Sequence, residues 1–157
     1  MTIPKCPTRV EGLDQILQGG IPAGRTTLLI GGPGAGKSLL GLEFLYRNAL
    51  AGEAGIFISF EERADALRDN VATLGWQLAA LEQSGKLFLF EARMDPKAIV
   101  TGEFGVQSFL AILGHKLKAM GAKCVVIDAL DVLMRLMADE TQAHSELQAL
   151  HYWLEER

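Results

Sequence analysis

Short apolar runs alternate with helix-like segments along most of this chain. Four runs are brief, uninterrupted and rich in β-branched or aromatic residues, a pattern that predicts strands buried in a sheet. The fourth run contains four apolar residues before an aspartate, which favours a strand covered on both faces. These predicted strands are residues 26–32 (TTLLIGG), 55–60 (GIFISF), 86–91 (KLFLFE) and 124–128 (CVVID).

Helical periodicity fills the intervals between these runs. From about Lys37, apolar residues recur at helical spacing until Gly52, which stands where a helix-ending glycine is expected. Residues 64–75 and 106–121 also predict helices, and a Gly- and Pro-containing loop at 92–105 separates two of these elements. Because strands and helices alternate, we expect an α/β fold with a parallel sheet and helices on both faces. Leucines and a methionine give the later helices one apolar face: Leu110, Leu113, Leu117 and Met120, then Leu147, Leu150 and Leu154.

Length and composition narrow the function classes. The 157 residues suit one domain, and 49% hydrophobic with 22% charged residues is ordinary globular material. A net charge of −4 argues against a nucleic-acid-coating protein. We find no signal peptide and no apolar run near ~18 residues, so we expect a cytoplasmic protein without a membrane segment. Cys6 and Cys124 are too few and too distant for a disulfide framework, and Cys124 is expected to be a buried small hydrophobe.

The strongest local motif is the glycine-rich stretch GGPGAGKS at residues 31–38. It satisfies G-x-x-x-x-G-K-[ST] and lies between a predicted strand and a predicted helix, the context that a phosphate-binding loop requires. Backbone N–H groups of such a loop surround phosphate oxygens, the lysine reaches the β- and γ-phosphates, and the Ser38 hydroxyl ligates magnesium. The predicted ATP-binding residues of this loop are Gly32, Pro33, Gly34, Ala35, Gly36, Lys37, Ser38 and Leu39.

Carboxylates follow two of the predicted strands. Asp128 ends the last strand, where it can hold magnesium through water and so form a metal site with Ser38. Glu61 and Glu62 follow the second strand, at the sheet edge where ligands of parallel sheets lie. One of these two glutamates is expected to orient a water against the γ-phosphate. The sequence leaves open which one does so, and both could instead be solvated charges that open the next helix.

These motifs together resemble the KaiC-like family of P-loop ATPases, which includes the circadian clock ATPase and autokinase of cyanobacteria. The similarity runs from about residue 8 to residue 157 and rests on GLD, GGIPAG, the phosphate loop, SFEE, LGW and VVIDAL. It implies a three-layer RecA-like core, ATP with Mg²⁺, and a homohexameric ring with possible signalling partners. It implies that Glu61 and Glu62 are paired catalytic glutamates. It also places Thr73 and Leu74 beside the base or sugar, although Leu74 and Trp76 fit the core equally well.

The sequence departs from the family pattern at two single residues and at its C-terminal end. Arg63 and Ala129 replace the usual neighbours of the glutamates and of Asp128, without removing a required group. The sequence stops within a helix, whereas the family continues into a strand between the phosphate-loop strand and the Asp128 strand. We therefore expect residues 1–157 to be a single RecA-like domain whose C-terminal part is missing, or a domain in which something else fills that gap. Residues that reach into a neighbour's site lie past that strand in the family, and a chain that lacks them is expected to bind Mg·ATP and to hydrolyse it weakly.

Two other functions fit the same motifs. One is a DNA-dependent ATPase of the RecA and RadA kind, whose DNA-binding loops would lie past residue 157 and which the acidic balance disfavours. The other is an assembly protein whose association is controlled by bound nucleotide, without hydrolysis. Stimulation by single-stranded DNA would indicate the first, and an ATP-dependent particle mass without phosphate release would indicate the second.

Overall fold

The computed structural model of the protein describes residues 3–92, 106–135 and 140–155. Its central element is a three-stranded parallel sheet in the order β4–β3–β5. Strands β3 (Gly55–Ser59), β4 (Leu87–Glu91) and β5 (Cys124–Asp128) confirm three of the four predicted strands. Ser59 lies opposite both Glu91 and Asp128, so the three strands end at one edge of the sheet.

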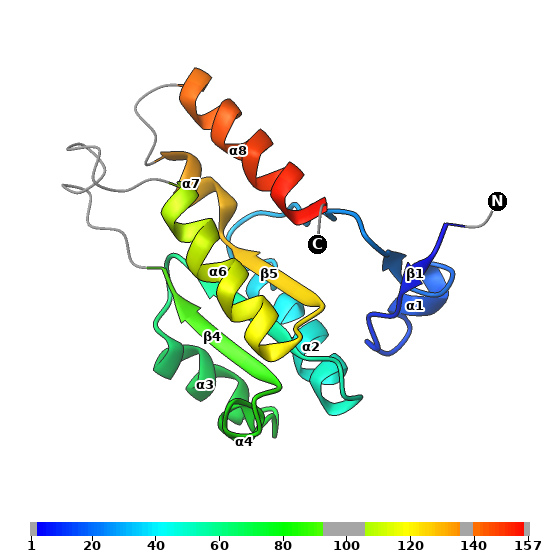
Figure 1. Cartoon of the computed structure of the whole chain (residues 1–157). Coiled ribbons are helices and arrows are strands. Elements are labelled where there is room, and N and C mark those ends of the chain that lie inside the picture. Colours follow the sequence, from blue (N-terminus) through cyan, green and yellow to red (C-terminus); the bar gives the residue numbers. More distant parts are fainter. Residues whose placement is uncertain (1–2, 93–105, 136–139, 156–157) are drawn as a thin grey trace.

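Helices cover both faces of this sheet, as predicted (Figure 1). Alternate residues of β3 point to opposite faces, so Phe57 joins one hydrophobic cluster while Ile56 and Ile58 join the other. The Phe57 cluster includes residues of α2, α3 and α4, and the other cluster includes residues of α6 and α8. The helices are α2 (Lys37–Leu50), α3 (Ala64–Ala72), α4 (Leu78–Gln83), α6 (Val106–Met120), α7 (Leu130–Arg135) and α8 (Glu140–Glu155).

The apolar face predicted for residues 106–121 is confirmed. Leu110 and Leu113 are buried, and Leu117 and Met120 pack against the same cluster. Helices α4 and α7 were not predicted, because six-residue helices carry too few turns for a clear periodicity. Past Ala92, the loop expected at 92–105 lies outside the described residues.

The prediction of a strand at residues 26–32 is wrong. The segment has no strand conformation, and Leu28, Leu29 and Ile30 are 66, 48 and 84% exposed. Among the described residues β5 pairs only with β3, and no strand forms a ladder with this segment. An apolar run without a partner leaves its backbone polar groups to water, whatever its composition.

Strand β5 also differs from the expectation of burial on both faces. Only Cys124 is buried, and the other four residues of the strand are partly exposed. The position of β5 at the edge of the sheet explains this partial exposure, since a strand lies beside it on one side alone.

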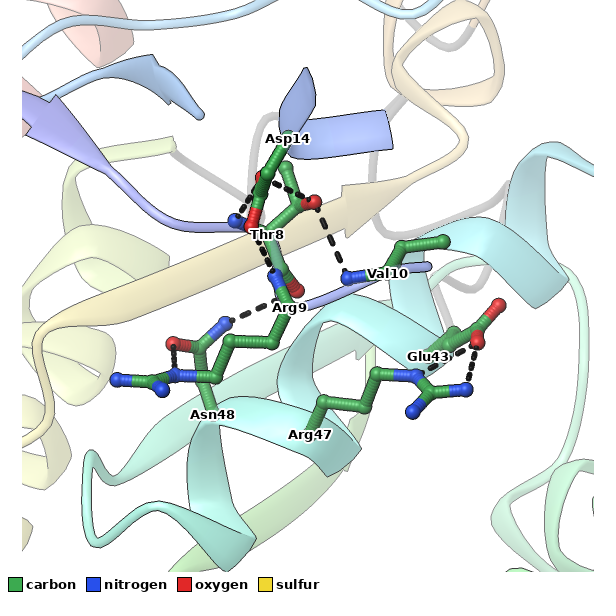
Figure 2. A network of polar contacts seen from close by, with 7 residues as sticks. All are labelled: Thr8, Arg9, Val10, Asp14, Glu43, Arg47 and Asn48. Carbon is green, nitrogen blue, oxygen red and sulfur yellow. Dashed lines mark hydrogen bonds and ion pairs between the residues drawn. The ribbon is translucent and has the colours of Figure 1, made fainter. Parts of the chain in front are cut away.

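An N-terminal unit packs against α2. Strands β1 (Lys5–Cys6) and β2 (Ile21–Pro22) pair antiparallel around the short helix α1 (Leu13–Ile16). Figure 2 shows how a polar network fastens this unit. The Asp14 carboxylate accepts hydrogen bonds from the Thr8 hydroxyl and from the backbone N–H groups of Thr8 and Arg9.

The same network extends to helix α2. The Arg9 guanidinium donates to Asn48 Oδ1 on α2 at 3.1 Å, and Asn48 Nδ2 donates to the carbonyls of Phe44 and Pro7. Asn48 is buried, and its side chain is therefore satisfied by both segments that it joins. These bonds fix the N-terminal unit to the helix that follows the glycine-rich loop. No helix in the described ranges is long and apolar enough to cross a bilayer.

Candidate nucleotide-binding site

The glycine-rich loop curls so that it ends directly in α2. Gly34 and Gly36 have φ angles of 75° and 80°, in the left-handed region that side-chain-bearing residues rarely adopt. The Ala35 N–H donates to the Gly32 carbonyl, which closes the turn. Gly36 is the N-cap of α2 and has no side chain that accepts from the first-turn N–H groups. The positive end of this helix is therefore open to an anion.

Lys37 folds back over the loop. Its Nζ donates to the carbonyl oxygens of Gly31 and Gly32 at 2.7 and 2.9 Å. The ammonium group thus lies above the loop, within reach of a phosphate that the loop would surround. A bound phosphate would exchange these carbonyl contacts for stronger, charge-assisted hydrogen bonds.

A pocket of about 320 Å³ opens beside this loop. Its size is within the range of small-molecule sites. Leu42 and Leu67 contribute an apolar surface, while Glu62 and Asn70 contribute polar groups. The lining residues are Gly34, Ala35, Gly36, Lys37, Ser38, Leu39, Leu42, Glu62, Leu67 and Asn70.

A glycine that sequence reasoning missed sets the position of α2. A Cβ atom on Gly41 would lie 2.8 Å from Val126 Cγ1 and 3.5 Å from Phe57. The helix therefore packs closely on β5 and β3 only because this residue has no side chain. A glycine inside a helix costs ~1 kcal/mol relative to alanine, so its place in the periodic pattern was the available signal of close packing.

The structure brings most of the predicted phosphate-loop residues together. Residues 34–39 line the pocket, and Gly32 and Pro33 directly precede them. Of the two glutamates, Glu62 lines the pocket, whereas Glu61 is exposed and, like Asp128, is absent from the lining in the described part of the chain.

Asp128 lies at the sheet edge beside the turn that carries these glutamates. It is opposite Ser59 in the ladder, and its carbonyl accepts from the Phe60 N–H at 2.8 Å. The peptide bond between Asp128 and Ala129 is cis. Among the described residues no three His, Cys, Asp or Glu side chains gather as a metal site. A magnesium ion here would therefore take few protein ligands and rely on phosphate oxygens and water, as this ion commonly does.

The residues expected near the base or sugar follow α3. Leu74 is 51% exposed, so the alternative that it belongs to the core is wrong. Trp76 stacks on Tyr46 at 5.4 Å between ring centroids and packs against the hydrophobic core. Thr73 is exposed, and neither it nor Leu74 is among the residues that line the pocket.

Comparison with known proteins agrees with this geometry. The sequence matches the family described as "ATPase: KaiC" over residues 6–157. The chain belongs to the KaiC ATPase family. It is 37% identical to the circadian clock protein KaiC2 of Synechocystis over all of this chain and 28% of that protein. It is 36% identical to the circadian clock oscillator protein KaiC of Thermosynechococcus vestitus, over 85% of this chain and 26% of that protein.

Two archaeal proteins are similar to this chain at comparable identity, and the chain covers a larger share of each. A UPF0273 protein of Pyrobaculum aerophilum is 38% identical over 85% of this chain and 50% of that protein. The crystal structure of a KaiC-like protein of Pyrococcus horikoshii superposes with a TM-score of 0.85 at 31% identity, over 99% of this chain and 67% of that one. The α/β, RecA-like class predicted from the sequence is thus confirmed. The chain spans about a quarter of the curated clock proteins that it matches and half of the Pyrobaculum protein.

Proposed function

We propose that this KaiC-family chain binds Mg·ATP in the pocket beside α2 and hydrolyses it to ADP and phosphate. The observation that carries the proposal is the joint lining of one pocket by the glycine-rich loop, Lys37, Ser38 and Glu62, which lies in the turn after β3. We infer that residues 1–157 act as a single ATP-binding domain of a cytoplasmic protein.

Each group has a task that its chemistry suits. The loop N–H groups and Lys37 bind the phosphates, and Lys37 leaves the carbonyls of Gly31 and Gly32 to do so. The Ser38 hydroxyl and Asp128 would hold the magnesium ion, which neutralises charge that develops on the phosphates. Thr73 and Leu74, which are exposed and directly follow α3, would lie near the base or sugar.

A glutamate orients the attacking water. Glu61 and Glu62 both follow β3 at the sheet edge, and Glu62 is the one whose side chain lines the pocket. A carboxylate here accepts a hydrogen bond from water and directs its oxygen toward the γ-phosphate, a contribution of typically ~10²–10⁴ in rate. Glu62 is therefore the first candidate for this role.

We further propose that subunits complete each other's sites in a homohexameric ring with possible protein partners in signalling. Groups supplied by a neighbour to a γ-phosphate are worth ~10³–10⁵ in rate. Isolated chains should consequently bind ATP well and hydrolyse it slowly.

Calorimetric titration with Mg·ATP, followed by phosphate release at increasing protein concentration, tests this proposal. Binding with one nucleotide per chain, and turnover that rises faster than linearly with concentration, are expected. A folded sample that takes up no nucleotide would contradict the binding site. Binding without phosphate release at any concentration would instead favour the nucleotide-gated assembly protein, and a rate raised by single-stranded DNA would favour the RecA-type ATPase.

A further inference from the structure

The two cysteines of the chain, Cys6 and Cys124, lie beside each other in the fold although they are far apart in the sequence. Both are free thiols. Cys124 belongs to the buried cluster that α2 covers, and Cys6 of β1 packs against that cluster. Burial and, after it, the electrostatic and hydrogen-bonding contact with the Cys6 side chain raise the pKa of the Cys124 thiol to about 12. The structure thus makes neighbours of two thiols whose spacing in the sequence had argued against a disulfide.

Backbone contacts near the C-terminal end of α2 hold both cysteines. The carbonyl of the residue that follows Cys6 accepts a hydrogen bond from Asn48 Nδ2 at 3.2 Å, and Asn48 is buried. Cys124 lies opposite Gly55 in the sheet ladder, where a Cβ atom on Gly55 would be 3.5 Å from Cys124 Cβ and 2.7 Å from Leu45 Cδ2. Leu45 and Asn48 belong to the last turns of one helix. The same end of α2 therefore fixes the places of both cysteines.

The two thiols differ in their access to solvent. Cys6 is half-buried, whereas Cys124 is only 6% exposed. A dissolved oxidant can therefore attack at Cys6 directly, but it reaches Cys124 only through Cys6. This difference sets an order of reaction, because thiol–disulfide exchange requires the attacking sulfur to approach the disulfide along its S–S axis.

We propose that Cys6 and Cys124 form an oxidation site, at which a small-molecule disulfide such as glutathione disulfide generates a disulfide bond that links the N-terminal unit to β5. The Cys6 thiolate attacks one sulfur of the reagent, whose S–S bond breaks, and the glutathione that leaves takes up the proton lost by Cys6. The Cys124 thiolate then attacks the Cys6 sulfur of this mixed disulfide and displaces the second glutathione, which takes up the proton lost by Cys124. The two cysteines lose two electrons, and the reagent gains them.

The site is independent of the hydrolysis proposed above and adds a redox-dependent link to the fold. Reduced glutathione reverses both steps, so the bond would follow the redox state of its surroundings. A disulfide between these positions closes a loop that contains most of the chain. Long loops gain most from closure, because the cross-link removes more conformational freedom from the unfolded state.

Oxidation of the reduced full chain tests the site. After incubation with glutathione disulfide, peptide mapping without reduction should show the Cys6 peptide joined to the Cys124 peptide within one chain. A chain with one glutathione on Cys6 should appear first, because the high pKa of Cys124 slows the second step. A glutathione adduct that never converts to the internal disulfide, or a disulfide that joins two chains, would overturn the proposal.

Two single substitutions test the order of attack. In Cys124→Ala, the glutathione adduct on Cys6 should persist, since no second thiol displaces it. In Cys6→Ser, Cys124 should react at least tenfold more slowly than Cys6 does in the unmodified chain, because the reagent cannot reach it. Circular dichroism verifies that both variants are folded. Rapid modification of Cys124 in folded Cys6→Ser would overturn the order proposed here.

Comparison of folded and unfolded protein shows whether the fold itself brings the thiols together. At equilibrium with mixtures of glutathione and its disulfide, the fraction of closed chain gives the effective concentration of one thiol near the other. We expect this value to be about 100-fold higher in the folded protein than in concentrated urea, and the thermal midpoint of the oxidised protein to be roughly 5–10 °C above that of the reduced one. Cys124→Ala should show no such shift. An effective concentration that is no higher in the folded protein, or a midpoint that oxidation lowers, would overturn the proposal.

Discussion

Strand β3 and residues 26–32 are similar apolar runs, but one is buried and the other is largely exposed. All five residues of β3 are buried, whereas Leu28, Leu29 and Ile30 are exposed. The difference lies in their neighbours, because β3 has a parallel partner on each side and residues 26–32 have none within the described chain. Apolar composition therefore favours a strand, but only a neighbouring backbone completes one.

The two regions also support the proposed site in different ways. Strand β3 leads into Glu62 and gives it a rigid base, while residues 26–32 lead into the phosphate loop without sheet support. The loop is held instead from its other end, by α2, which packs closely on β5 at Gly41 and is tied to the N-terminal unit at Asn48. A nucleotide should consequently order the loop far more than it orders β3.

The largest expected contrast comes from truncating one apolar side chain in each region. Phe57→Ala should lower the free energy of unfolding by about 3–5 kcal/mol, because Phe57 is fully buried in the core. Leu29→Ala should change it by less than about 0.5 kcal/mol, since nearly half of that side chain is exposed. Urea unfolding of both variants measures the difference. Similar losses at the two positions would show that residues 26–32 are packed in solution.

Nucleotide should stabilise the protein through the loop rather than through the sheet. At Mg·ATP concentrations 100 times the dissociation constant, binding should add ~2.7 kcal/mol to the free energy of unfolding. Lys37→Ala should lose most of this gain, because its ammonium group no longer reaches the phosphates. Thermal unfolding with and without Mg·ATP gives both values. Gains that match in the two proteins would place the nucleotide elsewhere.

The N-terminal network should contribute a smaller amount. Hydrogen bonds from the Thr8 hydroxyl and from the Thr8 and Arg9 N–H groups hold the pKa of the Asp14 carboxyl below its ordinary value. This contribution is present at neutral pH and is lost as the pH falls below ~4 through the folded-state pKa. Asp14→Asn should therefore cost about 1–2 kcal/mol at pH 7, and the deficit should shrink toward pH 2. Urea unfolding across that range tests this, and a constant deficit would contradict it.

The buried thiol of Cys124, at the start of β5, should make the stability of the protein fall at alkaline pH. Burial raises the pKa of the Cys124 thiol to about 12, so above pH ~9 the unfolded chain releases a proton that the folded chain retains. The free energy of unfolding should then fall by up to about 1.4 kcal/mol per pH unit. Cys124→Ala should show a shallower decline between pH 9 and 11. Parallel pH profiles for the two proteins would indicate that this thiol reaches solvent.

The smallest expected effect on stability is at Ile30, which is 84% exposed. Ile30→Ser should leave the free energy of unfolding within about 0.5 kcal/mol but reduce self-association, because exposed apolar side chains promote association. Light scattering at increasing concentration compares the variant with the unmodified chain. Increased association of the serine variant would mean that Ile30 is covered in solution.

The sequence predicted the elements that depend on residues close together along the chain. Helix α2 begins at the predicted Lys37, and α6 buries the predicted leucine face. The phosphate loop was recognisable because its glycines, lysine and serine work within eight consecutive residues. By contrast, the contact of Asn70 with Glu62 joins α3 to the turn that precedes it, and the approach of Gly41 to Val126 joins α2 to β5. No local sequence pattern predicts such contacts.

The sequence by itself thus determined the class of fold and predicted the phosphate loop and the pair of glutamates, since these follow from periodicity and from residue types at short spacing. Only the tertiary structure decided that residues 26–32 form no strand, that Glu62 rather than Glu61 lines the pocket, and that Leu74 is exposed. These outcomes depend on which backbone lies beside which, and on the direction in which neighbouring side chains leave a turn. Both are set when distant segments pack together.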